Sequence, residues 1–113
     1  MKFLNRSAVV VDGKQPFMDW INSVEDGSDS KFTLEQINYE SHIYLLDEYN
    51  TQDEFVELLL DEYERIFENE LSGWYNDESL WPENRTWKIF HQWFDINVVS
   101  MIFDLCPWKL KKE

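Results

Sequence analysis

The sequence is poor in four things, each of which would define a class of protein: cysteines, basic side chains, glycine with proline, and long apolar runs. Its 113 residues include one cysteine, three glycines and three prolines, with 10 Lys plus Arg against 23 Asp plus Glu. One cysteine forms no internal disulfide, and together with two histidines it supplies no zinc ligand set. No apolar run reaches the length of a signal-peptide core or a membrane span, so we expect a cytoplasmic protein.

The shortage of basic side chains gives a net charge of -13. A protein that binds nucleic acid by neutralising phosphates needs a surplus of Lys and Arg, and so does one that adsorbs to an anionic membrane. We therefore expect neither direct nucleic-acid binding nor membrane binding. The negative charge is concentrated in residues 25–83, where 18 acidic side chains face two basic ones.

The residues that are abundant indicate a folded chain. Hydrophobic residues make up 43% of the sequence, with six Trp, five Tyr and eight Phe. This composition excludes a disordered polymer, and the length suits one domain. We expect a single domain over residues 1–113, with an ordered core at about 6–106, a surface loop at 25–30 and a basic C-terminal tail at 107–113.

The apolar pattern alternates between short strands and helices. Short apolar runs predict strands at 7–11, 42–46 and 96–103. Helix-start signals and helical spacing predict helices at 16–24, 33–37, 51–72 and 86–94. The predicted order is β-α-(α)-β-α-α-β. Because helical crossovers between strands favour parallel pairing, we expect a small three-stranded, largely parallel sheet with packed helices, in the α/β or α+β class.

The helix over 51–72 is the clearest prediction. Thr51 and Glu54 form a capping-box pattern, and no Pro or Gly follows until Gly73. Its apolar residues share an arc of about 140°. Five acidic residues share an arc of about 80° on the other side. We call them the acidic stripe: Asp53, Glu57, Asp61, Glu64 and Glu68.

One segment carries a family resemblance. Residues 73–86 read GWYNDESLWPENRT. This motif, GWYxDESLWPxxRT, resembles a family of small acidic bacterial proteins without an assigned activity, and the similarity runs over about 6–105. The resemblance implies a cytoplasmic bacterial protein and no catalytic residues.

Three aspartates are the candidate metal ligands. Asp12, Asp47 and Asp104 each follow or end a predicted strand. In a parallel sheet such ends gather at one edge, where carboxylate oxygens could hold Mg²⁺. The alternative is that aspartate favours the turns that end strands. No motif calls for a cofactor, and neither histidine lies in a catalytic motif.

The aromatic side chains have two interpretations. Trp20, Trp87 and Trp93 lie in helical patterns and are expected in the core. A loop flanked by acids carries Trp74, Tyr75 and Trp81. For these three, packing and contact with a partner protein are equally supported, because Trp and Tyr are common anchors in both settings.

Two classes of function follow. The first is a non-enzymatic interaction domain that docks a basic protein surface through the 51–72 helix, with the acidic stripe and the loop aromatics as its interface. The alternative is a small enzyme or divalent-metal binder that uses the three aspartates. A weaker alternative within the first class is a DNA mimic, whose carboxylates imitate phosphates.

Overall fold

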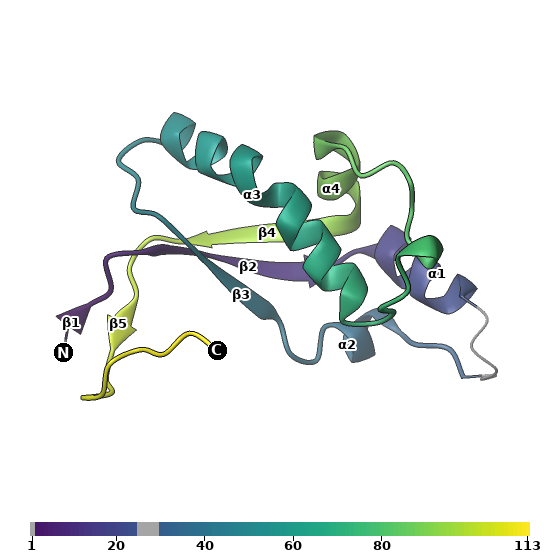
Figure 1. Ribbon diagram of the computed structural model, residues 1–113, viewed down its shortest axis with the longest axis horizontal. Helices are drawn as coiled ribbons and strands as arrows, with labels where there is room; N and C mark the ends of the chain where they lie inside the picture. Colours follow the sequence, from purple (N-terminus) through teal and green to yellow (C-terminus); the bar gives the residue numbers. More distant parts are fainter. Residues whose placement is uncertain (1, 25–29) are drawn as a thin grey trace.

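The computed structural model describes residues 2–24 and 30–113, so the loop expected at 25–30 lies outside the described residues except for Ser30. The chain forms an α+β structure (Figure 1). Its strands are β1 (Lys2–Phe3), β2 (Ser7–Gly13), β3 (His42–Leu46), β4 (Phe94–Val99) and β5 (Phe103–Asp104). Its helices are α1 (Gln15–Ser23), α2 (Leu34–Ile37), α3 (Gln52–Ser72), the short 3₁₀ helix η1 (Glu78–Leu80) and α4 (Trp87–Trp93).

The prediction of a largely parallel sheet is wrong. The three-stranded sheet has the order β3-β2-β4, and both outer strands run antiparallel to β2. In the register, Ser7 is opposite Leu46 and Ala8 is opposite Val99. A second, two-stranded antiparallel sheet pairs β1 with β5.

The physical reason for the antiparallel pairing lies at the end of β2. The side-chain amide of Asn38 accepts a hydrogen bond from Gly13 N and donates one to Gly13 O, both at 2.8 Å. Lys14 N donates to Trp93 O at 2.7 Å. These bonds bring the residues just before β3 and β4 back to the end at which β2 finishes. Both strands therefore start there and run in the reverse direction to β2.

The element boundaries otherwise follow the sequence signals closely. The Thr33 side chain accepts from Gln36 N, and the Gln36 side chain accepts from Thr33 N, which completes the capping box of α2. Thr51 caps α3 and Gly73 ends it. The strand expected at 96–103 is instead divided: β4 ends at Val99, and β5 pairs with β1 rather than with β2.

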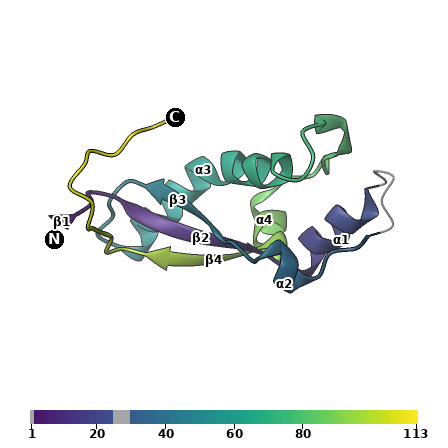
Figure 2. The same ribbon diagram turned by 90° about the horizontal axis from the view of Figure 1, so that it is seen from below.

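The helices cover one face of the three-stranded sheet. Figure 1 shows α3 running obliquely across β2, β3 and β4 with α4 beside it, and Figure 2 shows the same layers from below. Ser7, Val9 and Val11 of β2 are buried. Because side chains alternate along a strand, Ile43 and Leu45 of β3 point to the other face, where both are exposed.

The core lies between the sheet and the helices and is rich in aromatic rings. Phe67 of α3 packs edge-on against Phe94 with ring centroids 5.2 Å apart, and it also contacts Phe90 and Trp93. Trp20, Trp87 and Trp93 pack against this core and stay partly exposed. The aromatic cluster expected in the core is therefore present. The core residues are Val9, Val11, Phe17, Ile21, Leu46, Phe55, Leu59, Ile66, Phe67, Leu71, Phe90 and Phe94.

We expect Gly13→Ala to destabilise the protein by about 1–3 kcal/mol, because it inserts an atom into a packed core. A Cβ at this position would lie 2.5 Å from Cδ2 of Phe17, a side chain that is itself buried. Gly73→Ala is the matched control, since its Cβ would meet nothing closer than 3.5 Å. We expect this control to leave the stability unchanged or raise it by up to about 1 kcal/mol. Urea unfolding of both variants measures the difference, and equal stabilities would contradict the proposed role of Gly13.

Candidate functional site

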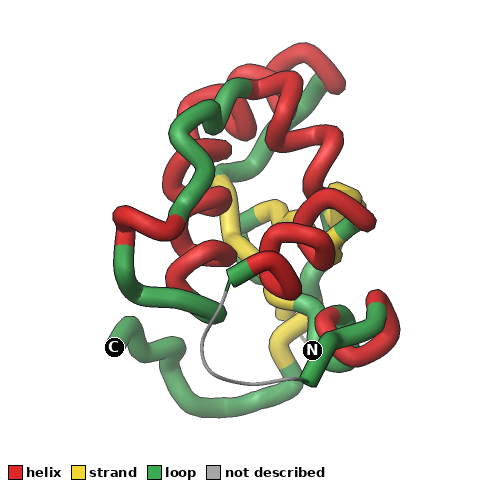
Figure 3. The backbone as a smooth tube through the Cα atoms, turned by 90° about the vertical axis from the view of Figure 1, so that its right-hand side faces the viewer, coloured by secondary structure: helices red, strands yellow, loops and turns green. Residues whose placement is uncertain are grey.

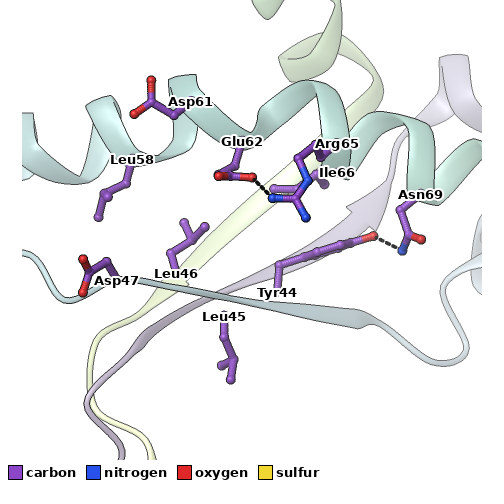
Figure 4. A pocket seen from close by; sticks show the side chains of 10 residues that line it. All are labelled: Tyr44, Leu45, Leu46, Asp47, Leu58, Asp61, Glu62, Arg65, Ile66 and Asn69. Carbon is purple, nitrogen blue, oxygen red and sulfur yellow. Dashed lines mark hydrogen bonds and ion pairs between the residues drawn. The ribbon is translucent and has the colours of Figure 1, made fainter. Parts of the chain in front are cut away.

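A groove of about 580 Å³ lies between α3 and β3 (Figure 4). Leu46 of β3 and Leu58 and Ile66 of α3 form its apolar floor. Tyr44 points up from β3 toward α3, whereas Leu45 points to the opposite side of the sheet. These positions follow from the two periodicities: alternate residues of β3 face the helix, and residues three or four apart on α3 face the strand.

Charged side chains form the rim of the groove. Asp47 stands at the end of β3, and Asp61 brings the acidic stripe to the upper edge on α3. Glu62 accepts a hydrogen bond from Arg65 at 2.8 Å, which neutralises that pair. The rim thus carries three carboxylates and one guanidinium, and its balance is negative.

One long side of the groove is an unpaired strand edge. β3 is the outer strand of its sheet, with β2 on one side only. Among the described residues, no other strand pairs with β3. Exposed N–H and C=O groups on such an edge can pair with an added strand. An extended segment bound there would lie beside the apolar floor of the groove.

A polar network around one buried carboxylate closes one end of the groove. Glu70 of α3 is only 7% exposed. Its Oε2 lies 2.6 Å from Nδ1 of His42 and accepts a hydrogen bond from the Tyr44 hydroxyl, which in turn accepts one from the Asn69 amide. Burial raises the pKa of Tyr44 well above its ordinary value, so the hydroxyl is protonated at neutral pH and acts as a donor. This network links the C-terminal half of α3 to β3.

The histidine–carboxylate pair is also an arrangement that can serve a general base. The hollow beside His42 and Glu70 measures about 170 Å³, which is below the usual size of a small-molecule site. The network is therefore best described as a structural clamp that sets the geometry of the groove.

The acidic stripe lies on the outer side of α3. Asp53, Glu57, Asp61 and Glu64 are exposed and Glu68 is half-buried. Glu68 has a basic neighbour, with Arg85 Nη2 3.5 Å from its Oε1. The stripe is thus one continuous solvent-facing surface that meets the groove at Asp61.

The loop aromatics lie half-buried, and the polar atoms of Tyr75 and Trp81 are engaged within the protein. Trp74 packs edge-on against Phe32 with ring centroids 4.9 Å apart. The Tyr75 hydroxyl donates to Ile21 O at 2.9 Å, and Trp81 Nε1 donates to Tyr75 O at 2.8 Å. Contact of these side chains with a partner stays an untested prediction. Their packing is sufficient to explain their presence.

The structure does not bring the three aspartates together. Asp12 lies near the end of β2, where it accepts a hydrogen bond from Ser41, whereas Asp47 lies at the opposite end of the sheet, because β3 runs antiparallel. Asp104 belongs to the second sheet, opposite Lys2. Within residues 2–24 and 30–113, no group of three His, Cys, Asp or Glu side chains is placed to hold a metal ion. The grouping rested on parallel strands, which this fold does not have.

No match comes from comparison of the chain with protein-family models, curated proteins and solved structures. The resemblance to small acidic bacterial proteins therefore stays a prediction. No helix among the described residues combines the length and the apolar character needed to cross a membrane.

Sequence reasoning identified the acidic stripe but missed both the groove and the clamp. Glu70 lies on the apolar arc of α3, between the directions of Leu59 and Tyr63, and a buried acid at such a position needs hydrogen-bond partners. That signal was present in the sequence. The identity of those partners, His42 and Tyr44, depended on the β3 register, which the pattern of residues does not provide.

We expect Tyr44→Phe to destabilise the protein by about 1–2 kcal/mol, because it removes a donor from a buried carboxylate. Tyr39→Phe is the matched control, since Tyr39 is exposed. It should change the stability by less than about 0.5 kcal/mol. Chemical denaturation compares the two variants, and equal stabilities would show that the Tyr44 hydroxyl contributes nothing to the clamp.

The pH dependence of stability should report on His91. Burial, and secondarily the charge of Lys14, lower the pKa of His91 below its ordinary value. As pH falls through about 6.5, the unfolded chain binds a proton that native His91 resists, so the free energy of unfolding declines. We expect His91→Gln to lessen this decline between about pH 7.5 and 5, measured by urea unfolding. Parallel pH profiles of parent and variant would contradict this expectation.

Proposed function

We propose that this protein is a non-enzymatic interaction domain that binds a basic, extended segment of a partner protein in the groove between α3 and β3. The observation that carries the proposal is the combination of an apolar floor, a negative rim and an unpaired strand edge in one groove. We further propose a cytoplasmic setting for this binding.

Each part of the groove suits one property of such a segment. The edge of β3 offers backbone hydrogen bonds to an added strand. Leu46, Leu58 and Ile66 offer contact to alternate apolar side chains. Asp47 and Asp61, together with the rest of the acidic stripe, attract a basic segment and speed its encounter with the groove.

The groove supports the interaction domain better than it supports the other two candidate functions. A DNA mimic presents phosphate-like charge, and an apolar floor has no counterpart in that surface. The enzyme or metal-binding alternative depended on Asp12, Asp47 and Asp104, which lie apart. Both alternatives stay untested, and the groove gives the interaction domain its support.

The test uses two labelled decapeptides, one alternating Lys with Leu and one alternating Lys with Ser, measured by fluorescence anisotropy. We expect the Lys/Leu peptide to bind more tightly, because only its leucines can occupy the apolar floor. Changing Glu57, Asp61 and Glu64 to Gln should weaken its binding about tenfold at low salt and much less at high salt.

The matched control changes Glu35, Glu78 and Glu83 to Gln, which removes the same charge from exposed positions outside α3. This variant should bind almost as the parent does. Equal losses in the two triple variants would mean that only net charge matters. Equal binding of the two peptides would show that the apolar floor does not contribute to binding.

A further inference from the structure

We propose that the segment that fits this groove is the basic C-terminal tail of a second copy of the same chain, so that two copies exchange tails. The tail comprises residues 107–113. This inference rests on the proposed function, because it names the occupant of the same groove.

The tail has the composition that the groove requires. Trp108 and Leu110 alternate with Lys109 and Lys111, and Lys112 follows. In an extended chain, Trp108 and Leu110 therefore face one side and the two lysines between and after them face the other. The tail forms no helix or strand, and its Trp108 side chain is 77% exposed and Leu110 64% exposed. An apolar side and a basic side are thus both available for contact.

The dimensions of the tail and the groove also agree. The α3 wall of the groove runs from Leu58 to Asn69. Eleven helical steps give this wall a length of about 17 Å. Six extended residues, 107–112, span about 20 Å, and the Trp108 and Leu110 side chains stand about 7 Å apart. Tyr44 and Leu46 on β3 have the same two-residue spacing, so a tail paired with this edge would stay in step with the floor.

The part of the chain that carries the tail projects from the domain. The paired β1 and β5 lie beyond one end of the three-stranded sheet in Figure 1, and Figure 3 shows the C-terminal segment running as a loop along the outside. The radius of gyration is 15.9 Å. A compact domain of this length would have about 13 Å. We call β1, β5 and residues 105–113 together the arm.

The arm exposes several large apolar side chains. Phe3 and Phe103 pack against each other with tilted rings whose centroids are 4.7 Å apart, yet Phe3 is 63% exposed. Leu105 and Trp108 add to this surface. A two-stranded ribbon of this size is marginally stable alone. Contact with a second copy would cover it.

Reciprocal exchange would cover Trp108 and Leu110, the two large apolar side chains of the tail, on both copies. Because each copy gives a tail and accepts one, the contact closes as a symmetric dimer.

The first experiment measures the mass of the full chain by light scattering at several concentrations. We expect a dimer, twice the 13.8 kDa of one chain, that dissociates on dilution. Trp108→Ala with Leu110→Ala should shift the equilibrium to the monomer by tenfold or more. The matched control, Tyr39→Ala with Leu60→Ala, removes an exposed aromatic and an exposed leucine away from the arm and should leave the dimer intact. Circular dichroism checks that both variants are folded.

The second experiment exchanges charges between tail and groove. Lys109→Glu with Lys111→Glu reverses the charge of the tail. Asp47→Lys with Asp61→Lys reverses the charge of the groove rim. Each variant alone should be monomeric, because every tail then meets a groove of its own sign. A mixture of the two should form a heterodimer, since the reversed tail fits the reversed groove and the two unaltered parts fit each other.

The outcomes separate this inference from the proposed function. A chain that stays monomeric while its groove binds the Lys/Leu peptide would overturn tail exchange and leave the proposed function standing. Failure of that peptide to bind even the tail variant would overturn both. A dimer that survives the Trp108 and Leu110 changes would place the interface elsewhere, and a mixture that stays monomeric would show that no tail reaches a second copy.

Discussion

The hydrogen bonds at the end of β2 are the constraint on which the rest of the structure depends. Asn38 holds both backbone groups of Gly13, and Trp93 O accepts from the next residue, Lys14. The connection from β2 to β3 and the connection from β3 to β4 are thereby both brought back to the end at which β2 finishes. The antiparallel order follows from this return, and with it the position of β3 as an outer strand under α3. The groove exists because this end of β2 fixes where β3 begins.

The clamp around Glu70 similarly fixes the position of α3, which forms the other wall of the groove. Burying a carboxylate is costly unless its oxygens have partners, and here His42 and Tyr44 provide them from β3. α3 is thus fixed to the strand by a polar contact at one end and by apolar packing along its length. A helix held in this way can carry many like charges on its outer side. The acidic stripe then shapes the electrostatic field near the groove while the core provides the stability.

Much of the local structure could be predicted from the sequence, and the arrangement of the strands could not. Capping signals at Thr33 and Thr51 are read within a few residues, and both threonines cap helices. Thr86, the first residue of the helix predicted over 86–94, caps α4 as well. Strand direction instead depends on contacts between distant residues, such as Asn38 with Gly13. The same reason explains the outcome for the candidate sites: the acidic stripe is set by helical period alone, whereas the groove, the clamp and the separation of Asp12 from Asp47 all depend on the register of β3.

The central place of β2 also affects how the chain folds. The partners of β2 lie far along the chain, and Ala8 pairs with Val99. Until those strands emerge, the apolar run of β2 has no sheet to join, while α3 can form locally around its own cap. Pairings so distant in sequence slow folding. The three-stranded sheet is thus completed only after β4 has formed and has returned to β2.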